Sequence, residues 1–196
     1  GAEPVESFVS SSSLLRPIRD ADDTGRPPFT AAKGMNYKLF VFDLDETLWT
    51  VSEGLCSLVR PPYHLATPDR LENDKGYWVE LKPGVRQLFK FLRSKKRYIS
   101  LASRNDPGPT MDLLEALQVS EYLDFPQLGW RPKEESIRRI IKELQKRDKV
   151  SIKPEEVFFL DDWPENVVPV KTWGATSLLY GQDVQSYEEL LEMLKG

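Results

Sequence analysis

Short apolar runs alternate with amphipathic segments along most of this chain. The runs at 39–42, 98–102, 125–130, 157–160 and 175–180 are each long enough for one strand. Apolar residues between them recur at helical spacing, as in 85–92, 111–117, 137–144 and 186–195. Unbroken apolar runs are typical of strands buried on both faces. Strands alternating with helices predict an α/β fold with a parallel sheet and right-handed crossovers.

A different pattern occupies residues 50–82. This segment is rich in turn formers, and residues 77–81 alternate between apolar and polar like a short strand. A turn at 73–76 would make 77–81 one arm of a hairpin. A stretch of this length without a long helix is unusual for a loop in a compact domain, which indicates a functional insert rather than a plain surface excursion.

Residues 1–34 show neither period. They contain four consecutive serines at 10–13, scattered prolines and an acidic patch at 20–23. We expect a flexible extension or leader here, followed by a single domain at 35–196.

Composition narrows the function. The net charge of −4 over 196 residues argues against a general nucleic-acid binder, and no apolar run approaches a membrane span. A single cysteine, Cys56, excludes an internal disulfide and suits a reducing compartment, so a cytoplasmic protein is expected. The single histidine, His64, leaves catalysis to carboxylates, Lys, Arg and Ser. Composition leaves the oligomeric state open.

Polar clusters follow three of the apolar runs. Asp43 and Asp45 end the first, Ser103 ends the second, and Asp161 with Asp162 ends the fourth, while Lys133 opens a helix. The carboxyl ends of parallel strands share one edge, so these groups should converge. An ideal strand would point Asp43 and Asp45 to the same side, where their repulsion requires a cation. Mg²⁺, which prefers oxygen ligands, fits this requirement.

These groups together predict phosphoryl transfer. Asp43 would attack phosphorus and become an aspartyl phosphate, and Asp45 would protonate the leaving oxygen and later deprotonate water. Lys133 would balance the negative charges, and Ser103 would donate a hydrogen bond to the transferring group.

The order Asp43-x-Asp45-x-Thr47, Ser103, Lys133, Asp161-Asp162 resembles the four motifs of the haloacid dehalogenase (HAD)-like superfamily over roughly residues 37–195. The resemblance implies a Rossmann-like three-layer core with strand order 5-4-1-2-3. It also implies that Mg²⁺ is bound by Asp43, by the backbone carbonyl of Asp45 and by Asp161, while Asp162 acts through water or orients the other ligands.

A closer resemblance is to the magnesium-dependent phosphatase family. It rests on residues 42–49, on Pro61-Pro62-Tyr63, on Ala102-Ser103-Arg104, and on 158–162 with Asn166. It implies that Arg104 and Trp49 sit at the active site and that 50–82 is a minimal β-type cap. An open site of this kind would accept a phosphosugar, a phosphotyrosine or another phosphoprotein side chain.

Two alternatives remain open. Residues 43–48 and Lys82-Pro83-Gly84-Val85 also resemble the serine/threonine phosphatases that act on polymerase tails. The chain could instead be a non-catalytic binding module that kept the fold. A phosphomutase would need a larger cap to exclude water. We expect Trp49, Trp130 and Trp163 to be packing residues, with Trp49 also a candidate for a wall of the substrate site, and we expect Cys56 to be inert.

Overall fold

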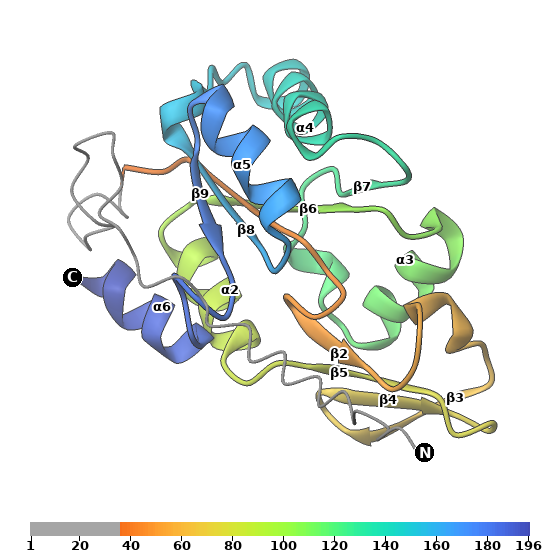
Figure 1. The fold of residues 1–196 in the computed structure, drawn as a ribbon. Coiled ribbons are helices and arrows are strands. Elements are labelled where there is room, and N and C mark those ends of the chain that lie inside the picture. Colours follow the sequence, from red (N-terminus) through yellow and green to blue (C-terminus); the bar gives the residue numbers. More distant parts are fainter. Residues whose placement is uncertain (1–35) are drawn as a thin grey trace, which may run out of the picture.

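Five parallel strands form the central sheet of the computed structural model, which describes residues 36–196 (Figure 1). The extension predicted at 1–34 lies outside the described residues. From one edge to the other, the sheet runs β7-β6-β1-β8-β9, which is the order 5-4-1-2-3 when its strands are counted along the chain and read from β9. The strands are β1 Leu39–Phe42, β6 Tyr98–Ser103, β7 Gln127–Leu128, β8 Val157–Asp161 and β9 Thr176–Leu179.

Strand β1 is buried on both faces, as its unbroken apolar run predicted. Phe40 and Phe42 pack into one apolar cluster, and Leu39 and Val41 pack into another. This alternation follows from the two-residue period of a strand. A parallel α/β architecture is therefore confirmed, with a separate hydrophobic layer on each side of the sheet.

Helices cover both faces of the sheet (Figure 1). Helices α4 and α5 contribute to the cluster around Val41, and α2, α3 and α6 contribute to the cluster around Phe42. Within residues 36–196, no helix combines the length and the apolar character needed to cross a bilayer. The helices are α2 Val85–Ser94, α3 Pro107–Ala116, α4 Lys133–Asp148, α5 Pro164–Trp173 and α6 Tyr187–Lys195, with short 3₁₀ turns at Cys56–Leu58, Ser120–Tyr122 and Pro154–Glu156.

The segment between β1 and α2 forms a second, antiparallel sheet in the order β2-β5-β4-β3. The hairpin expected from the sequence pairs β4 with β5, and the Asn73 side chain closes its turn by accepting hydrogen bonds from the backbone N–H groups of Lys75 and Tyr77. The strands are β2 Trp49–Val51, β3 Tyr63–Thr67, β4 Arg70–Asn73 and β5 Trp78–Leu81.

Gly84 joins this small sheet to α2 at a point where α6 approaches closely. Its φ is 88°, and a Cβ there would lie 3.0 Å from the Cβ of Tyr187. We expect Gly84→Ala to lower the free energy of unfolding by about 2 kcal/mol or more, because left-handed strain adds to the collision. Urea unfolding measures this. Gly76→Ala is the matched control, since its φ is 85° but no atom lies within 4 Å, and it should cost about 1 kcal/mol. Equal losses in the two variants would contradict a role for the collision.

Candidate active site

Asp43 follows the last residue of β1, at the carboxyl edge of the sheet. Its backbone N–H donates to the carbonyl of Leu160 in the neighbouring strand β8, which fixes its position. Its Oδ1 lies 2.9 Å from the Nζ of Lys133, and its Oδ2 lies 3.1 Å from the hydroxyl of Thr47. The remaining exposure of this half-buried carboxylate leaves it accessible to a ligand.

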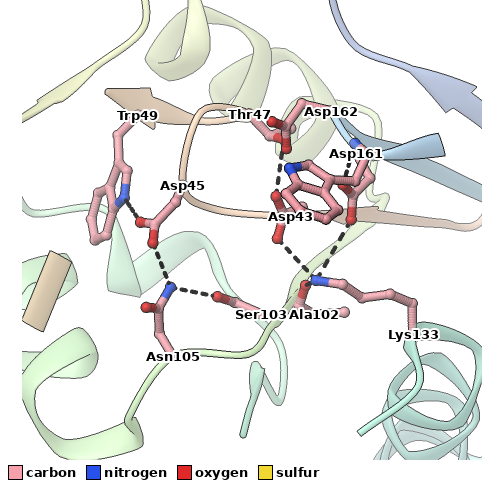
Figure 2. A network of polar contacts seen from close by, with 11 residues as sticks. Asp43, Asp45, Thr47, Trp49, Ala102, Ser103, Asn105, Lys133, Asp161 and Asp162 are labelled. Atoms are coloured by element: carbon pink, nitrogen blue, oxygen red, sulfur yellow. Dashed lines mark hydrogen bonds and ion pairs between the residues drawn. The ribbon is translucent and has the colours of Figure 1, made fainter. Parts of the chain in front are cut away.

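Asp161 and Asp162 come from the end of β8 and lie beside Asp43 (Figure 2). Oxygen atoms of the three carboxylates lie within 4.8 Å of one another. Burial, together with the negative charge of Asp43, raises the pKa of Asp161 to about 7 and that of Asp162 to about 6. The three acids that the sequence predicted as direct or water-mediated metal ligands are thus brought together.

The chemistry of this acidic cluster suits a divalent cation. All three donors are carboxylate oxygens, which hard cations prefer. The Oδ2 of Asp161 is fully buried and accepts no hydrogen bond from any residue in the described part of the chain, although Lys133 Nζ lies 3.6 Å away. An oxygen left without a hydrogen bond in a buried site is costly unless another partner satisfies it. A cation bound by the three acids would supply that partner.

Asp45 departs from the sequence-based expectation that it would point to the same side as Asp43. Its carboxylate lies apart from the acidic cluster (Figure 2), because β1 ends at Phe42 and the chain then turns through Glu46, whose φ is 61°. Its Oδ1 accepts a 2.7 Å hydrogen bond from the indole N–H of Trp49, and its Oδ2 accepts one of 3.1 Å from Asn105. Burial raises its pKa in spite of these two donors. Its side chain therefore has hydrogen-bond partners of its own, and its raised pKa favours the protonated acid.

Asn105 is a candidate that sequence reasoning missed. Its amide nitrogen donates to the Asp45 carboxylate and, at 2.8 Å, to the hydroxyl of Ser103 at the end of β6. It thereby links the two residues, and it is nearly fully buried. The only signal in the sequence was its place two residues after Ser103.

Lys133 is buried at the first turn of α4, with a side chain only 3% exposed. Its Nζ pairs with Asp43, lies within ion-pair distance of Asp161, and donates to the carbonyl of Ala102 in β6. A buried ammonium is costly unless it is paired, so the two acids account for its position. Lys133, predicted to balance the negative charges, therefore lies beside Asp43, the predicted nucleophile.

Thr47 connects the first motif to the acidic cluster and to the last helix. Its hydroxyl lies 3.1 Å from both Asp43 Oδ2 and Asp162 Oδ1, so its single proton serves one of them at a time. Its carbonyl accepts a 2.6 Å hydrogen bond from the buried hydroxyl of Tyr187 in α6. The loop after β1 is thus held from both sides.

Arg104 and Trp49 occupy contrasting positions. Arg104 is exposed on the loop directly after Ser103, and no residue of 36–196 forms an ion pair or hydrogen bond with its side chain. Trp49, expected as a wall of the substrate site, has no exposed surface and instead supports Asp45. In this geometry the indole of Trp49 holds the Asp45 carboxylate, whereas the side chain of Arg104 is exposed to solvent.

Comparisons with solved structures identify the class of fold. A HAD-superfamily hydrolase from Ehrlichia chaffeensis superimposes with a TM-score of 0.59 at 12% identity, covering 87% of this chain and 98% of that one. The N-terminal part of protein BF1531 from Bacteroides fragilis, which contains a phosphatase domain and was crystallised with Mg, gives a TM-score of 0.51 at 18% identity over 84% of this chain and 41% of that one. The fold is that of the haloacid dehalogenase-like hydrolases.

Sequence comparison specifies the family. Residues 36–194 match the acid phosphatase family, and the chain belongs to it. The human protein magnesium-dependent phosphatase 1 is 28% identical over 158 residues, covering 79% of this chain and 85% of that protein. The chain is therefore a phosphatase that hydrolyses phosphoric monoesters.

Proposed function

We propose that this phosphatase hydrolyses phosphomonoesters through an aspartyl-phosphate intermediate, with Mg²⁺ as its cofactor. The observation that carries the proposal is the position of Asp43. Its carboxylate lies between the ammonium of Lys133 and the acidic pair Asp161 and Asp162, at the open edge of the sheet. A carboxylate placed beside a fixed cation and a candidate metal site is suited to attack phosphorus.

Asp43, Asp161 and Asp162 would hold the Mg²⁺. When bound, the ion neutralises the carboxylates and polarises a phosphate oxygen. Two observations support it: the acidic cluster contains a buried oxygen without a hydrogen bond, and the human relative is named as magnesium dependent. The predicted participation of the Asp45 backbone carbonyl belongs to the same proposal.

The residues around Asp43 would transfer protons and bind the phosphate group. The raised pKa of Asp45 lets it carry a proton to the leaving oxygen, after which its carboxylate removes a proton from the attacking water. Asn105 and Trp49 orient it through their hydrogen bonds. Ser103 and Lys133 would bind the phosphoryl oxygens, and Arg104 would bind an outer phosphate or carboxylate oxygen of the substrate.

We further propose that the substrate is a phosphosugar, a phosphotyrosine or another phosphoprotein side chain. We also propose that the enzyme acts in the cytoplasm. The small antiparallel sheet at Trp49–Leu81 would act as the minimal cap. The free, buried thiol of Cys56, whose pKa burial raises to about 12, suits a reducing compartment in which it stays inert.

Phosphate release from p-nitrophenyl phosphate, measured with EDTA and then with excess Mg²⁺, tests the proposal. Turnover that EDTA abolishes and Mg²⁺ restores is the expected result. A panel of phosphosugars, phosphotyrosine peptides and phosphoserine peptides would then rank the substrates. A preference for phosphoserine peptides from polymerase tails would favour the alternative of a serine/threonine phosphatase that acts on those tails. A folded protein that turns over no substrate with any divalent ion would support the non-catalytic binding module.

Mg²⁺ should stabilise the protein more at high pH than at low pH. The raised folded-state pKa values mean that the folded protein binds more protons than the unfolded chain between about pH 4 and pH 7, so stability without metal falls as the pH rises through that range. Metal binding must displace those protons, so it is favoured above the range. Thermal melts with and without Mg²⁺ should show the larger rise in Tm near pH 8 rather than near pH 5.5.

Asp161→Asn should remove most of that rise, and Asp74→Asn, in the exposed β4–β5 turn, should leave it intact. An equal rise in Tm at both pH values would argue that Mg²⁺ binds elsewhere.

A further inference from the structure

Tyr187 is the first residue of α6 and one of the largest side chains without exposed surface. Helix α6 lies beside α2, on the face of the sheet that carries the apolar cluster around Phe42 (Figure 1). A buried tyrosine needs a hydrogen-bond partner for its hydroxyl. The partner of Tyr187 belongs to the loop 43–47, which follows β1 and begins with Asp43.

The hydroxyl of Tyr187 donates a 2.6 Å hydrogen bond to the backbone carbonyl of Thr47, 140 positions away in the chain. Thr47 is itself fully buried, and within residues 36–196 no backbone N–H donates to its carbonyl. A buried carbonyl that loses its donor pays the full cost of desolvation. The hydroxyl of Tyr187 therefore fixes the backbone at the end of the loop 43–47.

The ring of Tyr187 packs at the other end of the same loop. Its centroid lies 6.4 Å from that of Phe42, the last residue of β1 and the residue before Asp43. It also stacks on the ring of Tyr180 at 5.3 Å. One side chain of α6 thus contacts the residue that precedes the loop 43–47 and the residue that ends it.

Thr47 links this restraint to the acidic cluster. Its hydroxyl lies 3.1 Å from an oxygen of Asp43 and 3.1 Å from an oxygen of Asp162. In the described part of the chain, no hydrogen bond joins Tyr187 directly to either carboxylate. Any effect of the Tyr187 hydroxyl on these acids therefore passes through the backbone of Thr47, since a shift of that backbone would move the threonine hydroxyl away from both.

Two features keep Tyr187 in place as a donor. The side chain of Ser186, the N-cap of α6, accepts a 3.1 Å hydrogen bond from the backbone N–H of Glu189, which anchors the first turn of the helix. Burial raises the pKa of the Tyr187 hydroxyl well above its ordinary value, so the hydroxyl keeps its proton at neutral pH.

We propose that Tyr187 is a positioning residue for phosphoryl transfer, whose hydroxyl holds Thr47 where the threonine hydroxyl orients the Asp43 carboxylate toward phosphorus. The inference rests on the proposed function, in which Asp43 is the nucleophile. Ser103 and Lys133, which would bind the phosphate, are carried by β6 and α4, outside the loop 43–47. Displacing the nucleophile while these groups stay in place costs rate rather than substrate affinity.

Tyr187→Phe tests this inference, because it removes the hydroxyl and keeps the ring. It should lower kcat for p-nitrophenyl phosphate roughly ten- to hundredfold and leave KM within about twofold. Tyr37→Phe is the matched control, since Tyr37 is also buried and its hydroxyl also forms a 2.6 Å hydrogen bond, with Thr176, at the opposite end of β1 from Asp43. Both variants should lower Tm by a similar amount, but Tyr37→Phe should keep kcat within about twofold of wild type.

A double-mutant cycle with Thr47→Ala tests the route. Thr47→Ala should itself lower kcat, and adding Tyr187→Phe should then cost less than about twofold more, because the hydroxyl that Tyr187 positions is already absent. Losses that multiply in the double variant would overturn the route through Thr47. Wild-type kcat in Tyr187→Phe, or equal losses of kcat in Tyr187→Phe and Tyr37→Phe, would overturn the positioning role.

Hydrogen exchange reads the loop 43–47 without turnover. Its amides should exchange roughly tenfold faster in Tyr187→Phe than in wild type or Tyr37→Phe, and unchanged exchange would contradict the restraint. Acid quenching separates this inference from the proposed function. A wild-type protein that turns over substrate without trapping phosphate, while the kinetic results for Tyr187→Phe are as expected, would refute the covalent mechanism alone.

Discussion

Asp43→Asn is expected to lower kcat for p-nitrophenyl phosphate by about 10³-fold or more. The amide has no negative charge with which to attack phosphorus, and among residues 36–196 no other carboxylate has the same position between Lys133 and the pair Asp161 and Asp162. Phosphate release at saturating Mg²⁺ measures the effect. Acid quenching during turnover should trap phosphate on the wild-type protein and none on the variant.

Two controls separate chemistry from folding. Asp74→Asn makes the same change of side chain in an exposed turn far along the small sheet, and it should keep wild-type kcat. A thermal melt should show that the Asp43 variant is still folded, since Asp161 remains as a partner for the buried ammonium of Lys133. Wild-type turnover in the folded Asp43 variant would rule out the covalent mechanism.

Asp45→Asn should lower steady-state kcat by about 10²- to 10⁴-fold, in a manner that depends on the leaving group. The nitrophenolate ion leaves without a proton, so the first step should survive in this variant, whereas activation of water in the second step should not. The expected result is a rapid burst of about one equivalent of nitrophenolate followed by slow turnover. An alkyl phosphate, whose leaving oxygen needs a proton, should show no burst.

Stopped-flow absorbance at 400 nm, roughly the nitrophenolate maximum, follows the burst. Trp49→Phe provides the companion variant, because it removes one hydrogen-bond donor to Asp45 and keeps the carboxylate. It should lower kcat less and shift the acidic limb of the pH profile toward higher pH, since the indole N–H lowers the pKa of Asp45. A uniform loss for aryl and alkyl phosphates without a burst would exclude Asp45 as the acid and base.

Much of the fold was predictable because it depends on local pattern. The unbroken run at 39–42 indicated a strand buried on both faces, and residues 73–81 indicated a hairpin. The rule that parallel strands present their carboxyl ends at one edge was sufficient to predict that Asp43, Asp161 and Lys133 lie close together. The third strand was overestimated, since only Gln127–Leu128 pairs with β6.

Other features depended on contacts between distant segments. Asp45 faces away from Asp43 because the chain leaves the strand at Phe42, and the Asn105 side chain, 60 residues along, then meets its carboxylate. The one-residue spacing of Asp43 and Asp45 places both side chains on one side only if the strand continues through them, and the strand ends at Phe42. The exposure of Trp130 and Trp163 contradicted the expectation that they pack in the interior, whereas Trp49 does pack there.

The sequence alone was enough to predict the parallel α/β architecture and to predict which acidic and basic groups lie together at one edge of the sheet, because strand periodicity and chain topology govern both. Tertiary structure decided the orientation of Asp45, the hydrogen bonds of Asn105 and the exposure of Trp130 and Trp163. Those features are set by packing between residues far apart in the chain, and the local sequence around a residue does not specify which distant residues will contact it.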